Sequence, residues 1–373
     1  MSKKMDAAVR TCLDLGAFQH LRILALECRI NITTVTFLLG KLTGLTHFDA
    51  LCIDSSPGDQ VVWSTEVQLP ELQQLCLVAG KSHLRVSDLN LSDLRSVLPN
   101  LLYLKVYNFT THDPASFCPQ KIFPYLTDIE LSNNGFLVAP KFSFPFNLSR
   151  LEVSRMRHLE EDLIRPSQFP PTFPSLRALN LAGTSFTHQT LYSLLLPCPN
   201  TGYIPELESL NLDDATSIPF SVPLYHSITA GTNALFTLRS LSLKGHVNAV
   251  NDQTAHLFKE FRNLAMLGVQ NTPITSIGLR RLLERYPGDR PLRVIKVSGC
   301  LGLNWNDVRW LLAQETKTWA VTLRPYPEFR TRRECKEFAY MRIVDTDGLD
   351  SAAFEYFDYR PMREEDRAYE VVQ

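Results

Sequence analysis

The sequence predicts a right-handed α/β solenoid, in which a short strand and a helix alternate along the chain. Residues 264–272 read Leu-x-x-Leu-x-Val-x-x-Thr, and residues 292–300 read Leu-x-x-Ile-x-Val-x-x-Cys. In both copies the apolar residues alternate as in a short strand, and an apolar run with helical spacing follows. Because one such unit cannot bury its own apolar face, its neighbours must stack against it on both sides.

The same pattern extends through most of the chain as a leucine-rich repeat. The eleven candidate first leucines, 22 to 31 residues apart, are Leu21, Leu45, Leu72, Leu101, Leu126, Leu148, Leu176, Leu207, Leu238, Leu264 and Leu292. A twelfth strand is expected at Trp319–Leu323. We therefore expect a leucine-rich repeat solenoid, or horseshoe, with a parallel sheet on its concave face and irregular helices and turns on its convex face.

The pattern predicts three regions. Residues 1–17 are expected to form an N-terminal helical cap, because terminal repeats often depart from the consensus. Residues 18–325 hold a solenoid of about 11–12 repeats. Residues 326–373 carry an acidic, aromatic tail that is expected to dock in part as a C-terminal cap and to fray beyond about residue 360.

Helices are expected where apolar residues recur with helical spacing after a capping side chain. In the N-terminal cap this spacing covers residues 5–15. Between strands it covers Ser92–Leu98, Thr187–Leu195 and Asn251–Phe258, each of which opens on an oxygen that can accept from the first-turn N–H groups.

Composition is that of a folded protein without a strong charge bias. The chain is 45% hydrophobic and 21% charged, with a formal net charge of −1. This balance gives no general reason to expect nucleic-acid binding or attachment to a membrane.

No apolar run reaches the ~18 residues of a membrane-spanning helix. The start of the chain has no apolar stretch typical of a secretory signal. The eight scattered cysteines form no disulfide framework. We therefore expect a cytoplasmic or nuclear protein.

No motif for catalysis, cofactor binding or metal binding stands out. The nine histidines and eight cysteines have no spacing typical of a metal site. Residues 80–82 read Gly-Lys-Ser, but the first glycine of a phosphate-binding loop would fall at Leu75, inside an expected strand. No nucleophile elbow is present. The sequence therefore predicts a non-enzymatic protein with no cofactor and no metal.

The last two units, residues 271–283 and 298–312, resemble the cysteine-containing leucine-rich repeats of F-box substrate receptors. In earlier repeats the cysteine position is held by Thr184, Ala215 or His246. The resemblance implies that the repeat surface recognises a substrate, as in receptors of SCF ubiquitin ligases. No F-box precedes the repeats within residues 1–20, so a cullin-ligase adaptor is expected only if another feature recruits it.

Alternate strand residues should project from the concave face, because the leucines point into the core. The candidate partner-binding residues are Tyr103, Lys105, Tyr107, Asp128, Glu130, Arg150, Glu152, Asn180, Asn211 and Asp213. Two tyrosines beside three carboxylates would suit a peptide that carries Arg or Lys. The alternative is an ordinary solvent-facing sheet in which Lys105 and Arg150 neutralise the acids.

The C-terminal third is uneven in charge. Leu279–Ile343 holds 14 Lys and Arg against 7 Asp and Glu, whereas residues 344–373 hold nine acidic residues against three arginines. We expect the acidic tail to neutralise the last repeats. The alternative is a weak site for anions or nucleic acid, which a steep salt dependence would reveal.

These patterns predict a non-catalytic protein–protein interaction module, and the resemblance implies that it is a substrate-recognition component related to SCF receptors. The alternative is a leucine-rich regulator of a small GTPase or an enzyme.

Overall fold

The structure is a computed structural model that falls into two compact units, which are described separately. The first comprises Met1–Leu176 and Thr184–Tyr203, and the second comprises Arg177–Gly183 and Ile204–Gln373. The described residues are 11, 18–54, 68–79, 97–108, 123–132, 147–155, 173, 175–184, 191, 195, 206–215, 225, 228, 233–247, 250–283, 292, 294–297, 299, 300 and 303, with the strands 319–325, 338–345 and 369–371.

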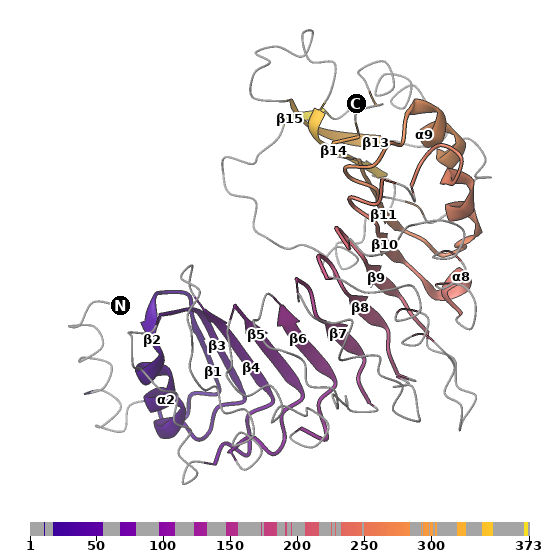
Figure 1. Ribbon diagram of the computed structural model, residues 1–373. Coiled ribbons are helices and arrows are strands. Elements are labelled where there is room, and N and C mark those ends of the chain that lie inside the picture. Colours follow the sequence, from indigo (N-terminus) through magenta and orange to yellow (C-terminus); the bar gives the residue numbers. More distant parts are fainter. Residues whose placement is uncertain are drawn as a thin grey trace. The chain divides into compact units, whose positions relative to one another are not determined.

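The first unit contains a parallel sheet in the strand order β1-β3-β4-β5-β6-β7 (Figure 1). The strands are β1 (Ile23–Leu26), β3 (His47–Asp54), β4 (Gln74–Ala79), β5 (Tyr103–Tyr107), β6 (Asp128–Ser132) and β7 (Arg150–Glu152), and the short β2 (Ile30–Asn31) pairs with the end of β3. One row of register partners forms the centre of the core, all at 0% exposure: Phe48, Leu75, Leu104, Ile129 and Leu151. Each of the strands β3 to β7 therefore turns one apolar face inward.

Helix α2 (Ile32–Lys41) packs against this unit by one apolar face. It begins at Asn31, whose side-chain oxygen accepts a hydrogen bond from the N–H of Thr33 at 2.8 Å. Its buried face is apolar apart from one threonine and consists of Ile32, Thr34, Val35, Leu38 and Leu39.

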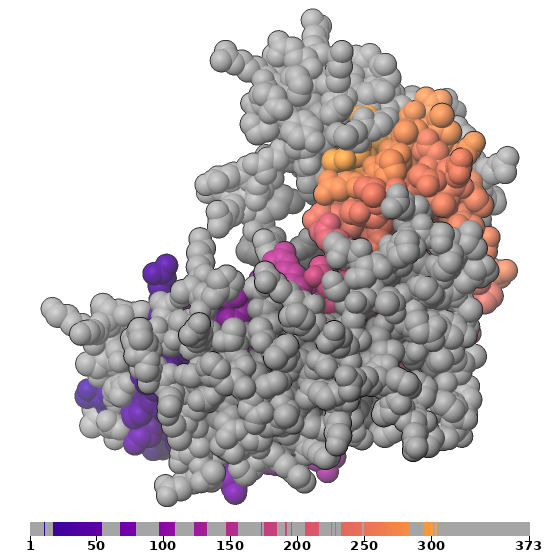
Figure 2. All heavy atoms as spheres, viewed as in Figure 1, coloured from indigo at the N-terminus to yellow at the C-terminus, as the bar shows by residue number. Residues whose placement is uncertain are grey.

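The second unit repeats the arrangement and then changes strand direction. Parallel strands β8 (Ala178–Asn180), β9 (Ser209–Asn211), β10 (Ser240–Ser242), β11 (Met266–Gly268) and β12 (Val294–Lys296) lie side by side. Three helical segments, α8 (Ala234–Thr237), the 3-10 helix η2 (Ala255–Glu260) and α9 (Ser276–Leu283), lie along one side of these strands (Figure 1). The core row of the second unit consists of register partners at 1% exposure or less: Leu179, Leu210, Leu241, Leu267 and Ile295. In Figure 2, the residues around η2 and α9 form a continuous orange area of the visible surface.

These strands confirm the leucine-rich repeat solenoid. Ten of the eleven predicted first leucines are at most 4% exposed, and Leu21 is half-buried. Hydrogen-bonded parallel pairing follows the predicted phase from strand to strand within each unit. The expected region boundaries at residues 17 and 325 stay predictions.

The C-terminal strands differ from the expected continuation. Trp319–Pro325 forms a strand, β13, but β14 (Phe338–Asp345) lies between β12 and β13 and runs antiparallel to both. The predicted strand at this place is therefore confirmed, whereas its expected parallel pairing as the next strand of the solenoid is wrong. The physical reason is that alternating apolar residues predict a strand without specifying its partner. We also expected fraying beyond about residue 360, yet β15 (Tyr369–Val371) pairs with β13.

The described residues include only part of the expected helices. The segment 251–258 forms a 3-10 helix that begins only at Ala255, after the Asn251 side chain has accepted from the N–H groups of Gln253 and Thr254. Of residues 5–15, only Thr11 is described, and it is helical. Most of 92–98 and 187–195 also lies outside the described residues.

Seven repeats end their strand with the same backbone turn. The eighth residue of the unit has a positive φ of 53–80° in seven repeats, at Asn108, Arg155, Gly183, Asp214, Gly245, Asn271 and Gly299. Four of the seven carry a side chain in the left-handed region, which favours glycine or asparagine. This turn directs the chain out of the sheet toward the helical side.

In three repeats the side chain of the ninth residue ties the repeat to the previous one. Thr184 Oγ1 donates to Val153 O at 2.7 Å, and Cys300 Sγ donates to Val269 O at 3.1 Å. His246 Nε2 lies 2.6 Å from Leu212 O and occupies the same place. Three different donors thus bond the sixth residue of the preceding repeat, so this hydrogen bond does not require a cysteine. Two other repeats lack the bond, because Ala215 has no side-chain donor and Thr272 Oγ1 donates within its own repeat, to Val269 O at 2.7 Å.

Candidate partner-binding face

Strand register brings the predicted residues of the first unit together on one sheet face. Tyr103, Asp128 and Arg150 are register partners on β5, β6 and β7, and so are Lys105, Glu130 and Glu152. The intervening core residues are fully buried, so the side chains on either side of them project to the opposite face. We call this set the charged face: Asp49, Gln74, Tyr103, Lys105, Tyr107, Asp128, Glu130, Arg150 and Glu152.

Glu130 is the most buried charge of the face, at 7% exposure. Lys105 Nζ lies 2.6 Å from its Oε1, and the Tyr103 hydroxyl donates to its Oε2 at 3.3 Å. Burial, followed by the negative charge of Glu130, raises the pKa of Tyr103 above its ordinary value. Burial is the largest single effect on the pKa of Lys105 and lowers it, but the charge of Glu130, its hydrogen bond and the further negative groups Cys76 and Glu152 together outweigh burial, so the pKa rises. Both groups therefore keep their protons and hold the carboxylate.

Glu152 is held by a second group of contacts. Arg150 Nη2 lies 3.3 Å from its Oε2, and Ser132 Oγ donates to its Oε1 at 3.3 Å. Ser154 Oγ in turn donates to Ser132 Oγ at 2.8 Å. Burial, followed by repulsion from Glu130 on the adjacent strand, raises the pKa of Glu152. For Glu130 and Glu152, the geometry therefore fits the alternative interpretation, in which Lys105 and Arg150 neutralise the acids.

Asp128 and Asp49 are different, because no cation of the described residues contacts them. Asp128 Oδ2 accepts from Thr127 Oγ1 at 2.7 Å, and Asp49 Oδ1 accepts from Gln74 Nε2 at 3.2 Å. Both aspartates are half-exposed. The charged face carries four carboxylates against two cations, so an uncompensated negative charge remains at its half-exposed aspartates.

Sequence reasoning missed the two serines that complete this network. Ser132 and Ser154 are buried at 2% and 9% exposure, one alternation beyond Glu130 and Glu152. Extending the outward positions by two residues past each strand pattern would have found them. Between Asp49 and Lys105 in register lies Cys76, whose thiol pKa burial raises to about 12, so it is an inert neighbour.

The remaining predicted residues belong to the second unit and already serve its backbone. Asn180 Oδ1 accepts from Ala182 N at 3.0 Å, and Asn211 Oδ1 accepts from Asp213 N at 2.9 Å. Asp213 Oδ1 accepts from Ser242 Oγ at 2.6 Å and from Lys244 N at 2.8 Å. Burial raises the pKa of Asp213. Asp213 therefore links two repeats, and no described contact joins these residues to the charged face.

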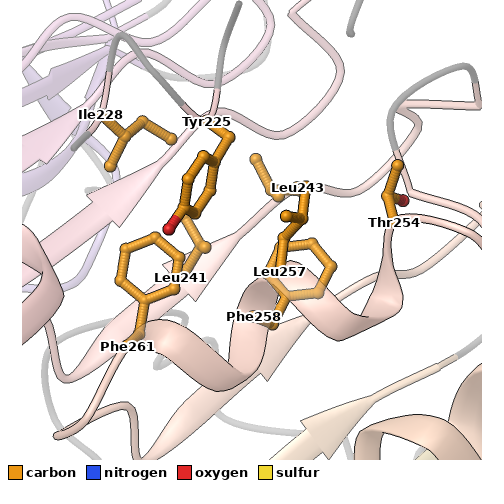
Figure 3. A pocket seen from close by; sticks show the side chains of 8 residues that line it. All are labelled: Tyr225, Ile228, Leu241, Leu243, Thr254, Leu257, Phe258 and Phe261. Atoms are coloured by element: carbon orange, nitrogen blue, oxygen red, sulfur yellow. The ribbon is translucent and has the colours of Figure 1, made fainter. Parts of the chain in front are cut away.

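A small cavity in the second unit lies between the sheet and the helical side (Figure 3). It is lined by Tyr225, Ile228, Leu241, Leu243, Thr254, Leu257, Phe258 and Phe261 and has a volume of about 10 Å³. Such a space holds about one water molecule, and its walls are apolar. Tyr225 stands at the cavity with its ring edge toward Phe261 and its hydroxyl bonded to Glu260. The cavity is a packing gap and not a ligand site.

Two further findings bear on function. Within the described ranges, no group of three or more His, Cys, Asp or Glu side chains is placed to hold a metal ion. Among the helices that the structure describes, none has the length and apolar character to cross a membrane.

The strand register and the buried leucines define the fold of this chain as a leucine-rich repeat solenoid. No protein-family model matches the sequence, and no curated protein matches it. Among solved structures, that of Listeria monocytogenes InlP is similar over 77% of this chain and 75% of that chain, with 14% sequence identity and a TM-score of 0.33. A similarity at this level adds nothing to the assignment, which rests on the strand register and the buried leucines.

Proposed function

We propose that this chain is a non-catalytic protein–protein interaction module and that its partner binds the charged face. The observation that carries the proposal is Asp128, a half-exposed carboxylate without a described cationic partner. It lies in register with Tyr103 and Arg150. Such a carboxylate can accept a charge-assisted hydrogen bond from an incoming cation.

The partner's contacting segment is a basic peptide. A Lys or Arg of the partner would meet Asp128, while the half-exposed Tyr107 and Tyr103 offer aromatic rings beside it. Glu130 and Glu152 contribute negative potential, but Lys105 and Arg150 already occupy their oxygens. Buried aromatic residues and desolvated charge pairs supply most of the binding energy of typical interfaces.

The test is affinity purification from native lysate with matched variants. Asp128→Asn removes the charge at constant shape, and Tyr107→Ala removes an aromatic ring. Glu208→Gln, on the second unit, is the matched control for loss of one carboxylate. We expect at least a tenfold loss of the specific partner with the first two variants, equivalent to about 1.4 kcal/mol, and none with the control. Equal recovery of every protein by all variants would show that the charged face is not the binding surface.

The identity of the recovered protein separates the finer forms of the proposal. The resemblance of the last repeats to F-box receptors predicts recovery of a cullin-ligase adaptor together with a substrate. A small GTPase or an enzyme in place of the adaptor would favour the regulator. For localisation we propose the cytoplasm or nucleus, supported by the four described cysteines, Cys28, Cys52, Cys76 and Cys300, which are free thiols.

A further inference from the structure

The sheet face of the second unit differs from the charged face, because its side chains are small and neutral. Across β8 to β11, the residues that project opposite the core are Ala178, Asn180, Ser209, Asn211, Ser240, Ser242, Met266 and Gly268. We call the part formed by Ser209, Asn211, Ser240, Ser242 and Gly268, with Ala178 and Asn180 at its end, the polar floor. It spans three strand spacings, or about 14 Å.

Two hydroxyls of the polar floor have no hydrogen-bond partner among the described residues. Ser209 and Ser240 are register partners on β9 and β10, and their exposures are only 5% and 8%. Within the described part of the chain neither Oγ makes a hydrogen bond. Folded proteins retain few buried polar groups without a hydrogen bond, so the two hydroxyls on adjacent strands indicate a partner from outside the chain.

A third unpartnered atom lies at the far end of the floor. Gln270 Oε1 is buried and accepts no hydrogen bond from any described residue. It reaches over Gly268, where an added Cβ would come within 2.9 Å of it and 2.4 Å of Ser242 Oγ. Ser242 Oγ and Gln270 Oε1 therefore occupy the space over Gly268 that a Cβ would fill, which only a glycine at this position allows.

The asparagines add donors to the same surface. The Oδ1 atoms of Asn180 and Asn211 are used by backbone N–H groups two residues ahead. Their Nδ2 amides donate to no residue that the structure describes, and both side chains are half-exposed. The polar floor therefore offers amide donors, hydroxyls and one amide acceptor, all uncharged.

We propose that the polar floor binds the main chain of an extended, uncharged polypeptide segment from a partner. A peptide backbone presents alternating N–H and C=O groups, which match neutral donors and acceptors spaced along a sheet. Small side chains let a main chain approach closely, and about four extended residues span the floor. Met266 and the exposed Arg177–Glu208 ion pair flank it. This site is separate from the charged face, so the two are tested independently.

The first experiment needs no ligand. Ser209→Ala/Ser240→Ala removes two unpartnered hydroxyls, so the melting temperature of the free full chain should stay the same or rise. Ser132→Ala is the matched control, because its hydroxyl is bonded to Glu152 and Ser154, and its melting temperature should fall. A fall with the double variant as large as that of the control would show that these hydroxyls have partners within the chain, and would overturn the proposal.

The second experiment uses a displayed library of random eight-residue peptides, selected on the full chain. We expect enriched peptides without charged residues at their centre, whose affinity falls at least tenfold in Asn180→Asp/Asn211→Asp. That variant keeps both Oδ1 acceptors, removes the amide donors and adds two negative charges. N-methylation of central peptide amides should weaken binding more than alanine substitution of the side chains, while Asp128→Asn should leave it unchanged. Failure to enrich any peptide, or binding that the Asp variant or N-methylation leaves intact, would refute a main-chain site here.

Discussion

Lys105 Nζ lies 2.6 Å from Glu130 Oε1, and this pair joins neighbouring strands β5 and β6 on the charged face. The two partners are unequally buried, since the lysine side chain is 29% exposed and the glutamate side chain 9%. Removing the cation therefore leaves a charge in a poorly hydrated place, whereas removing the carboxylate leaves a lysine that can reach water. The cost of breaking the pair depends on which partner is lost.

Lys105→Met should destabilise the first unit by about 3 kcal/mol, because among the described residues Glu130 then keeps only the hydrogen bond from the Tyr103 hydroxyl. Glu130→Gln should cost about 1 kcal/mol, the usual value of one hydrogen bond. The double variant Lys105→Met/Glu130→Gln should be more stable than Lys105→Met alone. Urea denaturation of the four proteins gives the coupling energy, and a coupling near zero would show that the pair is not a structural link.

His246 should make the stability of the second unit depend on pH. Its Nε2 faces the oxygen of Leu212, which can only accept, so the neutral ring carries its proton there. Burial lowers the pKa of His246 below its ordinary 6.5. The unfolded chain then binds the proton more tightly, so stability is lost as pH falls below about 6.5. At pH 5.5 the loss is at most about 1.4 kcal/mol.

The measurement is denaturation between pH 7.5 and 5.5. His246→Asn retains an amide donor for Leu212 O but has no titrating group. It should therefore reduce the slope of the unfolding free energy against pH by an amount equivalent to at most one bound proton. His256→Asn, at an exposed site on η2, is the control and should keep the wild-type slope. An unchanged slope in His246→Asn would assign the pH dependence to other groups.

The repeat phase could be predicted from the sequence because leucine burial and strand alternation are local rules. Residues such as Leu126 and Leu207 fall at 0% exposure where the pattern puts them, and Tyr103, Lys105 and Glu130 share a face because alternation decides it. The same rule predicted that the residues of the charged face lie next to one another.

Pairing within that face could not be predicted, because it depends on rotamers and burial. Lys105 pairs with Glu130, whereas Asp128 accepts a hydrogen bond from Thr127. Both Asp128 and Glu130 project from β6, so alternation alone does not decide which of them the lysine contacts. The C-terminal strand order was also beyond local rules. The residues Trp319–Leu323 specify a strand, but only its long-range partner Phe338–Asp345 determines that it is antiparallel.

The strand-ending turn predicts opposite effects at two equivalent positions. Arg155 has a φ of 57° and is exposed, so Arg155→Gly should stabilise the first unit by about 0.5–1 kcal/mol through relief of backbone strain. Gly245 has a φ of 80°, and an added Cβ would lie 2.5 Å from Asp214 Oδ1. Gly245→Ala should therefore cost more than about 2 kcal/mol. Denaturant midpoints measure both changes, and equal signs would contradict a shared turn.

Asp252 caps α9 from the preceding repeat, so its loss should loosen that helix selectively. Its Oδ1 accepts from Thr275 N at 2.8 Å and from Gly278 N at 3.0 Å, while its Oδ2 accepts from Thr275 Oγ1 at 2.5 Å. A carboxylate at a helix N-terminus also favours the helix dipole. Asp252→Ala should cost about 1–2 kcal/mol and speed amide hydrogen exchange within Ser276–Leu283. Asp252→Asn keeps an acceptor and should recover part of the protection. Unchanged exchange in Asp252→Ala would mean that packing of the buried Leu279 and Leu282, and not the cap, holds the helix.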